Sequence, residues 1–364
     1  MPVVDPSNIP ILDSHIHLYP ESELDSLTWY TGPEHPLAQQ RTPDLYKRVI
    51  AGAKPASGTE RPFMGAIFVE TDRKHDIVSD PPNYDGPLAE LAWLRRIVEG
   101  KPKDGEGHGE EDKTLLSAIV PWAPLPLGPD AVAEYLTKAE EAAGPETWKL
   151  AKGFRYLLQD KPLGVGVEPK FIGSLKLLGK RGFAFDVGVD IHRRGKKQLE
   201  ETVDMIEAAH EGVPDDEKCV FILNHLCKPD FSALHPADPQ FVGWKSALYI
   251  LGKNPKVYMK LSGGFAEMSD NLKRGSRSQI FTGTMPWLST LLATFTNRIM
   301  FGSDWPVCTV GVESDEDGDQ KENAWGKWRD VVEFICDMAS MEKDAQERVW
   351  FGAAMEAYGI ENKE

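Results

Sequence analysis

Short hydrophobic runs recur along the chain and alternate with amphipathic stretches. Eight of these runs are rich in β-branched and aromatic residues, and two of them, Ala66–Val69 and Val220–Leu223, are continuously apolar. Continuous apolarity is typical of strands that are buried on both faces of a parallel sheet. The predicted strands are Ile9–His15, Phe63–Glu70, Leu115–Val120, Ala151–Leu157, Phe183–Val189, Cys219–Asn224, Lys256–Leu261 and Arg298–Ser303.

Helical patterns lie between these runs. A strand that alternates with a helix indicates βαβ units. Eight such units in one chain predict a (β/α)₈ TIM barrel, an α/β fold that would use residues 1–364 as a single domain. A doubly wound open sheet is the alternative. The predicted helices are Pro87–Glu99, Asp130–Ala142, Lys170–Leu178, Lys197–His210, Pro239–Leu251 and Met285–Thr294.

Three segments interrupt the alternation and are expected to be surface insertions. Gly100–Lys113 has almost no apolar residue, which predicts a mobile loop. Thr31–Arg61 and the acidic segment Gly311–Asn323 each follow a predicted strand. Barrels build their active sites on the face where strands end, so these two segments are expected to form a rim or lid.

Charge and composition exclude several classes of partner. The net charge is −16, from 41 basic and 57 acidic residues, whereas nucleic acids and anionic membrane surfaces require a basic footprint. No stretch approaches the ~20 apolar residues that span a membrane, and the N-terminus lacks a secretory pattern. The four cysteines form no CxxC pair, which predicts a cytoplasmic protein. The ten tryptophans could line a pocket or a dimer interface, so a homo-oligomer stays open.

Polar residues gather where the predicted strands end. In a barrel these ends meet on one face, and a packed parallel strand tolerates a charge only where the charge is paired or functional. We therefore expect the strand-end residues to surround one site. In chain order they are Asp13, His15, His17, Glu70, Arg155, Asp190, His192, Asn224, His225, Lys260, Ser262, Ser303 and Asp304.

The first and last of these strand ends predict a metal site. His15 and His17 are one residue apart, so a strand would send both imidazoles to the same side. Converging neutral imidazoles are good ligands for zinc and similar divalent metals. Asp304 would add a carboxylate ligand, or a base for a metal-bound water, and Glu70 is a further candidate ligand. Core histidines with satisfied hydrogen bonds, or a helix cap at Asp304, are the alternatives.

Other strand-end residues are predicted to contact a substrate. Arg155 lies in an apolar run, where a guanidinium needs an anionic or carbonyl partner such as a substrate oxygen. His192 and Lys260 are further candidate substrate-binding residues, and His192 could equally be structural. His225 directly follows an apolar strand and is assigned to the site. The histidines in loop or helix contexts, which are expected at the surface, are His35, His75, His210 and His235.

Together these motifs resemble the amidohydrolase superfamily, in its branch of sugar-lactone and related lactone hydrolases. The matching segments occur in the expected order and span most of the chain. They are Leu12–Tyr19, Gly153–Arg155, Phe221–Pro229, Lys260–Gly263 and Phe301–Pro306. The resemblance implies a (β/α)₈ barrel that opens cyclic esters with water.

The resemblance also implies roles for individual residues. His15 and His17 would line the site and hold a metal where one is bound, although the branch includes members thought to work without one. Asp304 would activate the water, and His225 would contact the substrate carbonyl or help to hold the metal. Arg155 would bind substrate oxygens. The chain departs from the family at Asn224, where Asp is common, which leaves the charge and tautomer of His225 open.

The leading prediction is therefore a lactonase that opens a small aldonolactone, such as a rhamnono- or fuconolactone. The attacking water would be held by Asp304 and by a divalent metal, for which zinc is the first candidate. Gly-x-Ser-x-Gly is absent, which argues against a serine nucleophile of the α/β-hydrolase type. Three alternatives remain: a hydrolase of a carboxylated pyrone or muconolactone that needs no metal, a metal-dependent decarboxylase on the same scaffold, and a non-catalytic binding protein.

Overall fold

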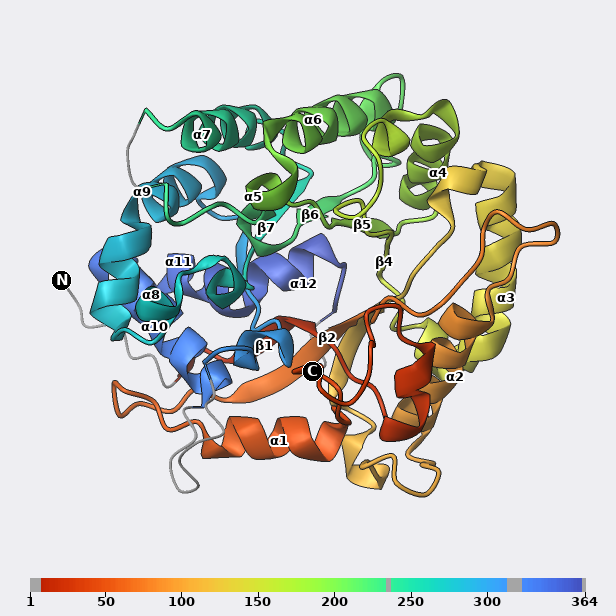
Figure 1. Ribbon diagram of the computed structural model, residues 1–364, viewed down its shortest axis with the longest axis horizontal. Coiled ribbons are helices and arrows are strands. Elements are labelled where there is room, and N and C mark those ends of the chain that lie inside the picture. The colour runs from red at the N-terminus through yellow and green to blue at the C-terminus, as the bar shows by residue number, and fades with distance from the viewer. Residues whose placement is uncertain (1–7, 234–236, 313–322, 362–364) are drawn as a thin grey trace.

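Parallel strands form the centre of the molecule, and helices surround them (Figure 1). The structure is a computed structural model that describes residues 8–233, 237–312 and 323–361. Each of the eight predicted strands overlaps a strand within these residues. The strands are β1 (Ile11–Ile16), β2 (Phe63–Val69), β3 (Leu116–Val120), β4 (Gly153–Arg155), β5 (Ala184–Val187), β6 (Phe221–Leu223), β7 (Val257–Leu261) and β8 (Ile299–Phe301).

The strands pair in chain order, as β1-β2-β3 and as β4-β5-β6-β7-β8. Parallel bridges between single residues join these two sheets. Ile119 pairs with Ala151 where β3 meets β4. Where β8 meets β1, the Asp304 amide donates to the His15 carbonyl (2.9 Å). The eight strands therefore form the predicted (β/α)₈ barrel. The junction of β8 with β1 brings Asp304 next to the segment of His15 and His17.

Helices pack around the outside of this ring. All six predicted helices are present, as α2 (Asp85–Glu99), α3 (Pro129–Trp148), α4 (Pro169–Lys180), α6 (Lys196–His210), α7 (Pro239–Leu251) and α9 (Arg277–Phe295). None of the described helices is long and apolar enough to cross a membrane. The other α-helices of the described residues are α1 (Pro43–Gly52), α5 (Ile191–Arg194), α8 (Asp270–Lys273), α10 (Ala324–Met338), α11 (Lys343–Glu347) and α12 (Ala353–Ala357).

The short helix α12 lies inside the ring (Figure 1). Its alanines and the following Tyr358 pack against inward-facing strand residues such as Leu12, Ile222 and Met300. Small side chains allow the helix to approach the strands closely, which fills the interior at the density of a protein core. The segment Phe351–Ala354 contains the start of this helix.

One of the insertions differs from its expected description. The Gly100–Lys113 segment was expected to be a mobile surface loop. This expectation is wrong for two of its acidic side chains, which are buried. Glu106 and Asp112 are at most 2% exposed, because Glu106 pairs with Arg96 (2.5 Å) and Asp112 with Lys47 (2.6 Å). A paired carboxylate can be buried where an unpaired one cannot. Most of the predicted acidic rim, residues 313–322 of Gly311–Asn323, lies outside the described residues.

Candidate active site

A cavity of about 310 Å³ lies where the strands end, walled by the segments that follow β1, β2, β4, β5, β6 and β8. Six of the strand-end residues that were expected at the site line it: His17, Glu70, Arg155, Asn224, His225 and Asp304. This position, at the carboxyl ends of the strands, is where TIM barrels carry their active sites.

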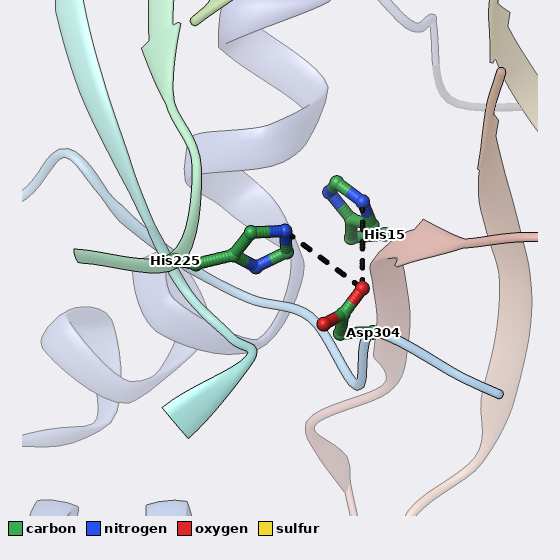
Figure 2. Close-up of side chains that lie close together, drawn as sticks. All are labelled: His15, His225 and Asp304. Atoms are coloured by element: carbon green, nitrogen blue, oxygen red, sulfur yellow. Dashed lines mark ion pairs between the residues drawn. The ribbon is translucent and has the colours of Figure 1, made fainter. Parts of the chain in front are cut away.

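The Asp304 carboxylate faces several imidazoles at the floor of the cavity. Its Oδ1 atom lies 3.5 Å from Nε2 of His17, 3.7 Å from Nε2 of His15 and 3.8 Å from Nε2 of His225. Figure 2 shows Asp304 between His15 and His225, which come from strands far apart in the sequence. The sequence predicted His15, His17 and Asp304 as neighbours and His225 as a further residue of the site, and all four lie together.

Burial and neighbouring charges shift the pKa values of these imidazoles and of Asp304. Burial lowers the pKa of His225 to about 3 and also lowers that of His15, so both rings are neutral at pH 7. Burial opposes ionisation of Asp304, but His225, His17 and Lys228 outweigh it and hold the pKa of this carboxyl below its ordinary value. The site therefore combines an ionised carboxylate with neutral imidazoles, which suits a base and metal ligands.

Hydrogen bonds to the other ring nitrogens orient the imidazoles. His17 Nδ1 lies 2.9 Å from the Val69 carbonyl, which only accepts, so Nδ1 carries a proton and donates to this oxygen. His225 Nδ1 lies 2.9 Å from Ser262 Oγ. Each ring is thus held from behind, with Nε2 toward Asp304.

The backbone that carries His225 and Asp304 is in a conformation that L-residues rarely adopt. Asp304 has φ 60°, and the four residues from His225 to Lys228 all have φ between 51° and 60°. The left-handed region costs about 1–2 kcal/mol per residue, so it persists only where the surroundings enforce it. Here the Trp244 indole donates to the Leu226 carbonyl (2.7 Å) within the turn. Strain concentrated at this turn is typical of a functional site.

Asp13 fixes β1 against the segment that carries Asp304. Its Oδ1 accepts from the Ser303 amide (2.8 Å), and its Oδ2 accepts from the Tyr46 hydroxyl and the Trp325 indole (2.8 Å each). Burial raises the pKa of Asp13, whereas these hydrogen bonds lower it. A fully bonded carboxylate of this kind holds two strand ends in register, which supports the geometry of the site.

Glu70 and Arg155 form a buried pair on another wall of the cavity. Arg155 Nε donates to Glu70 Oε1, and its second nitrogen donates to the Glu70 carbonyl (2.6 Å each). The other carboxylate oxygen of Glu70 accepts from the Asp72 amide (2.5 Å). Among the described residues, Glu70, a predicted metal ligand, is not part of the cluster of ligand atoms that His15, His225 and Asp304 form.

His192 and Lys260 are not among the residues that line the cavity. His192 Nδ1 lies 2.9 Å from Glu267 Oε2. Lys260 is fully buried and donates to Asp186 Oδ2 (2.6 Å) and to His15 Nδ1 (3.1 Å). These positions do not favour the predicted contacts with a substrate, which stay predictions.

Sequence reasoning missed a wall of the cavity that comes from the segment after β1. Tyr19, Trp29, His35 and Leu37 line this wall. His35, which was expected at the surface, is partly exposed, and its ring packs on Trp29 with centroids 5.0 Å apart. The only feature of the sequence that pointed to this wall was the length of the Thr31–Arg61 insertion after a strand. This insertion was predicted at the rim of the site, and two of its residues, His35 and Leu37, line the cavity.

A second carboxylate, Glu90 on α2, supports the wall next to Glu70. It accepts from the Thr71 amide (3.1 Å) and hydroxyl (2.5 Å), and Thr71 lines the cavity. Burial raises the pKa of Glu90 to about 7, although Arg73 lowers it. The folded protein therefore binds this proton more tightly than the unfolded chain does, between pH 4.5 and about 7.

Stability is thus expected to fall as the pH rises from 4.5 through 7, because the folded state must then hold a buried charge. The shift corresponds to roughly 3 kcal/mol at 1.36 kcal/mol per pKa unit. Urea unfolding of the wild type and of Glu90→Gln at pH 5 and pH 8 measures this contribution. The wild type should lose more stability between these two values than Glu90→Gln. Equal losses in the two proteins would show that Glu90 ionises as it does in the unfolded chain.

Similarity to known proteins agrees with this geometry. A sequence model of the amidohydrolase family matches residues 175–360. An L-rhamnono-gamma-lactonase from Scheffersomyces stipitis is 32% identical over 362 residues, which cover 97% of this chain and 100% of that protein. The chain belongs to the amidohydrolase family. The resemblance drawn from the order of the motifs is therefore confirmed.

Two further proteins are similar to this amidohydrolase. An L-fucono-1,5-lactonase from Burkholderia multivorans is 27% identical over 256 residues, which cover 68% of this chain and 73% of that protein. A solved amidohydrolase from Burkholderia multivorans with bound zinc has 23% identity and a TM-score of 0.66, and the match covers 96% of this chain and 99% of that one. At this identity the structural match supports the fold.

The donor set of the amidohydrolase fits a divalent metal. Among the described residues, His15, His225 and Asp304 each offer a ligand atom within 4.8 Å of the others, and Asp304 Oδ1 is buried without a hydrogen bond. Two ligands on a tetrahedral zinc ion lie about 3.3 Å apart, close to the 3.5–3.8 Å seen around this oxygen.

One hydrogen bond opposes metal binding at His15. The Lys260 ammonium group can only donate hydrogen bonds, and it donates one to His15 Nδ1. Nδ1 of His15 must therefore accept, which puts the ring proton on Nε2. That nitrogen lies 3.2 Å from Nε2 of His17, to which it donates. A metal on both rings would displace this proton, as ligand protons are generally displaced when a metal binds.

Proposed function

We propose that this protein is a lactonase that hydrolyses a small sugar-acid lactone, such as L-rhamnono-1,4-lactone, to the open hydroxy acid. The observation that carries the proposal is the Asp304 carboxylate, which lines the cavity and whose Oδ1 atom lies within 3.8 Å of Nε2 of His15, His17 and His225. The similarity of the whole chain to an L-rhamnono-gamma-lactonase supports this choice of substrate.

In the proposed mechanism Asp304 accepts a proton from water as the water oxygen attacks the lactone carbonyl. His225, held by Ser262, contacts the carbonyl oxygen, and Arg155 binds other oxygens of the substrate. Asp304 then returns the proton to the ring oxygen as the ester bond breaks. A divalent metal held by His15, His17, His225 and Asp304, with zinc as the proposed ion, would supply Lewis acidity and a more acidic water.

The charges of the cavity favour a neutral substrate. Two cationic side chains, Arg155 and Lys228, and four acidic ones line it, and Glu70 neutralises Arg155. A pyrone or muconolactone with carboxylates would require several available cations. A neutral, hydroxylated ring requires none, and Tyr19 and Trp29 offer it amphipathic aromatic surfaces.

We also propose a cytoplasmic location. All four cysteines are buried thiols, and none forms a disulfide. This state is typical of a protein that works in a reducing compartment.

A lactone panel followed by proton release tests the reaction and the substrate class together. We expect the protein to hydrolyse aldonolactones, to leave a pyrone dicarboxylate unchanged, and to lose activity with a chelator and regain it with zinc. A parallel sample without enzyme corrects for spontaneous ring opening. Release of carbon dioxide from aromatic acids, with no lactone turnover, would instead identify a decarboxylase. Full activity in chelator would remove the metal from the proposal and leave the lactonase.

A further inference from the structure

We propose that Lys228 is a catalytic residue whose ammonium group binds the lactone carbonyl oxygen as that oxygen becomes negatively charged. The inference rests on the proposed lactonase function, and it names a residue to which the motif around His225 assigned no role.

The backbone positions Lys228 at the cavity. It is the last residue of the left-handed turn that begins at His225, with φ 51°, and it lines the same cavity as His225 and Asp304. Its carbonyl accepts from the His192 amide (3.0 Å), which holds the end of the turn. Because one strained turn carries both side chains, the position of Lys228 is tied to that of His225.

The charge of Lys228 is not neutralised by a carboxylate. Its Nζ atom donates to the neutral Gln159 Oε1 (2.7 Å), and no ion pair involves it among the described residues. The two other cations near the site differ, since Arg155 pairs with Glu70 and Lys260 pairs with Asp186 (2.6 Å each). Lys228 is therefore the cationic side chain lining the cavity that is available to bind a negative charge on the substrate.

The field of Lys228 already reaches the reacting groups. Its positive charge contributes to lowering the pKa of both Asp304 and His225. A charge that acts on these two side chains also acts on a substrate oxygen bound beside them. In a buried site such an interaction is stronger than in water, because less solvent screens it.

The reaction creates the charge that Lys228 would bind. Asp304 takes a proton from water, the carbon–oxygen bond forms, and the carbonyl oxygen becomes an oxyanion. The oxyanion collapses, the ring carbon–oxygen bond breaks, and the leaving oxygen takes the proton from Asp304. The acid so formed ionises and releases a proton to solvent. The lactone itself is neutral, so Lys228 stabilises the transition state more than the bound substrate.

Steady-state kinetics of Lys228→Met and Lys228→Arg test this role on L-rhamnono-1,4-lactone. We expect Lys228→Met to lower kcat about 10²-fold, the usual effect of removing one oxyanion donor, with KM changed only a few-fold. Lys228→Arg, which keeps the charge, should recover part of kcat. Inhibition by the aldonate product, whose carboxylate carries the same charge, should weaken in Lys228→Met and return in Lys228→Arg.

Lys161→Met is the matched control, because Lys161 lies over the Tyr156 ring and does not line the cavity. Its kinetics should equal those of the wild type. Thermal unfolding checks that each variant folds, and Lys228→Gln replaces Lys228→Met if the latter does not. An unchanged kcat in Lys228→Met, or an arginine variant no better than the methionine one, overturns the inference alone. A wild type that hydrolyses no lactone overturns the proposed function as well.

Discussion

Replacement of Asp304 by asparagine is expected to lower kcat for aldonolactones by ~10²–10⁴-fold, the range that a positioned general base supplies. The amide keeps the size of the side chain but cannot take a proton from water. Asparagine also tolerates the left-handed backbone, here φ 60°, so the segment after β8 should keep its structure. Initial rates of lactone opening, measured by proton release, give the change in kcat.

Asp216→Asn, an exposed position, removes the same charge far from the imidazoles and should leave the rate unchanged. Unfolding temperature and aldonate binding of Asp304→Asn show whether the fold and the cavity survive. If Asp304→Asn folds and hydrolyses lactones at nearly the wild-type rate, Asp304 is not the base and the mechanism is incorrect.

Replacement of Lys260 by methionine is expected to destabilise the protein by about 3–5 kcal/mol, the cost of removing one partner from a buried ion pair. Lys260 and Asp186 are both fully buried and lie 2.6 Å apart. Without Lys260, Asp186 keeps only the hydrogen bond from the Tyr358 hydroxyl (2.6 Å). The remaining charge would then be buried without a counter-ion. Urea unfolding followed by tryptophan fluorescence measures the loss.

The double variant Lys260→Met/Asp186→Asn provides the control, because it removes both charges together. It should recover much of the stability that the single variant loses, since a buried pair is often replaceable as a unit. A single variant as stable as the wild type would show that the pair contributes nothing. The KM of the double variant also tests the predicted substrate contact of Lys260, because an unchanged KM contradicts that contact.

The barrel could be predicted because its strands are buried on both faces. Continuous apolar runs such as Val220–Leu223 mark such strands, and all eight predicted runs coincide with observed ones. The helices α1 and α12 could not be predicted so readily. The α1 segment lies inside a Pro- and Gly-rich insertion, and α12 is helical because the barrel interior receives its alanines. Tertiary packing decides such elements.

By itself the sequence determined that His15, His17 and Asp304 lie together. Strand periodicity sends His15 and His17 to one side, and the order of strands in a barrel makes Asp304 their neighbour. Only the tertiary structure decided which residues meet. It brings His225 to Asp304, pairs Glu70 with Arg155, and places Lys260 beneath His15. The physical reason is that periodicity fixes which face of a strand a side chain points to. The partner of a buried charge depends instead on which side chains of neighbouring strands lie beside it in the folded barrel.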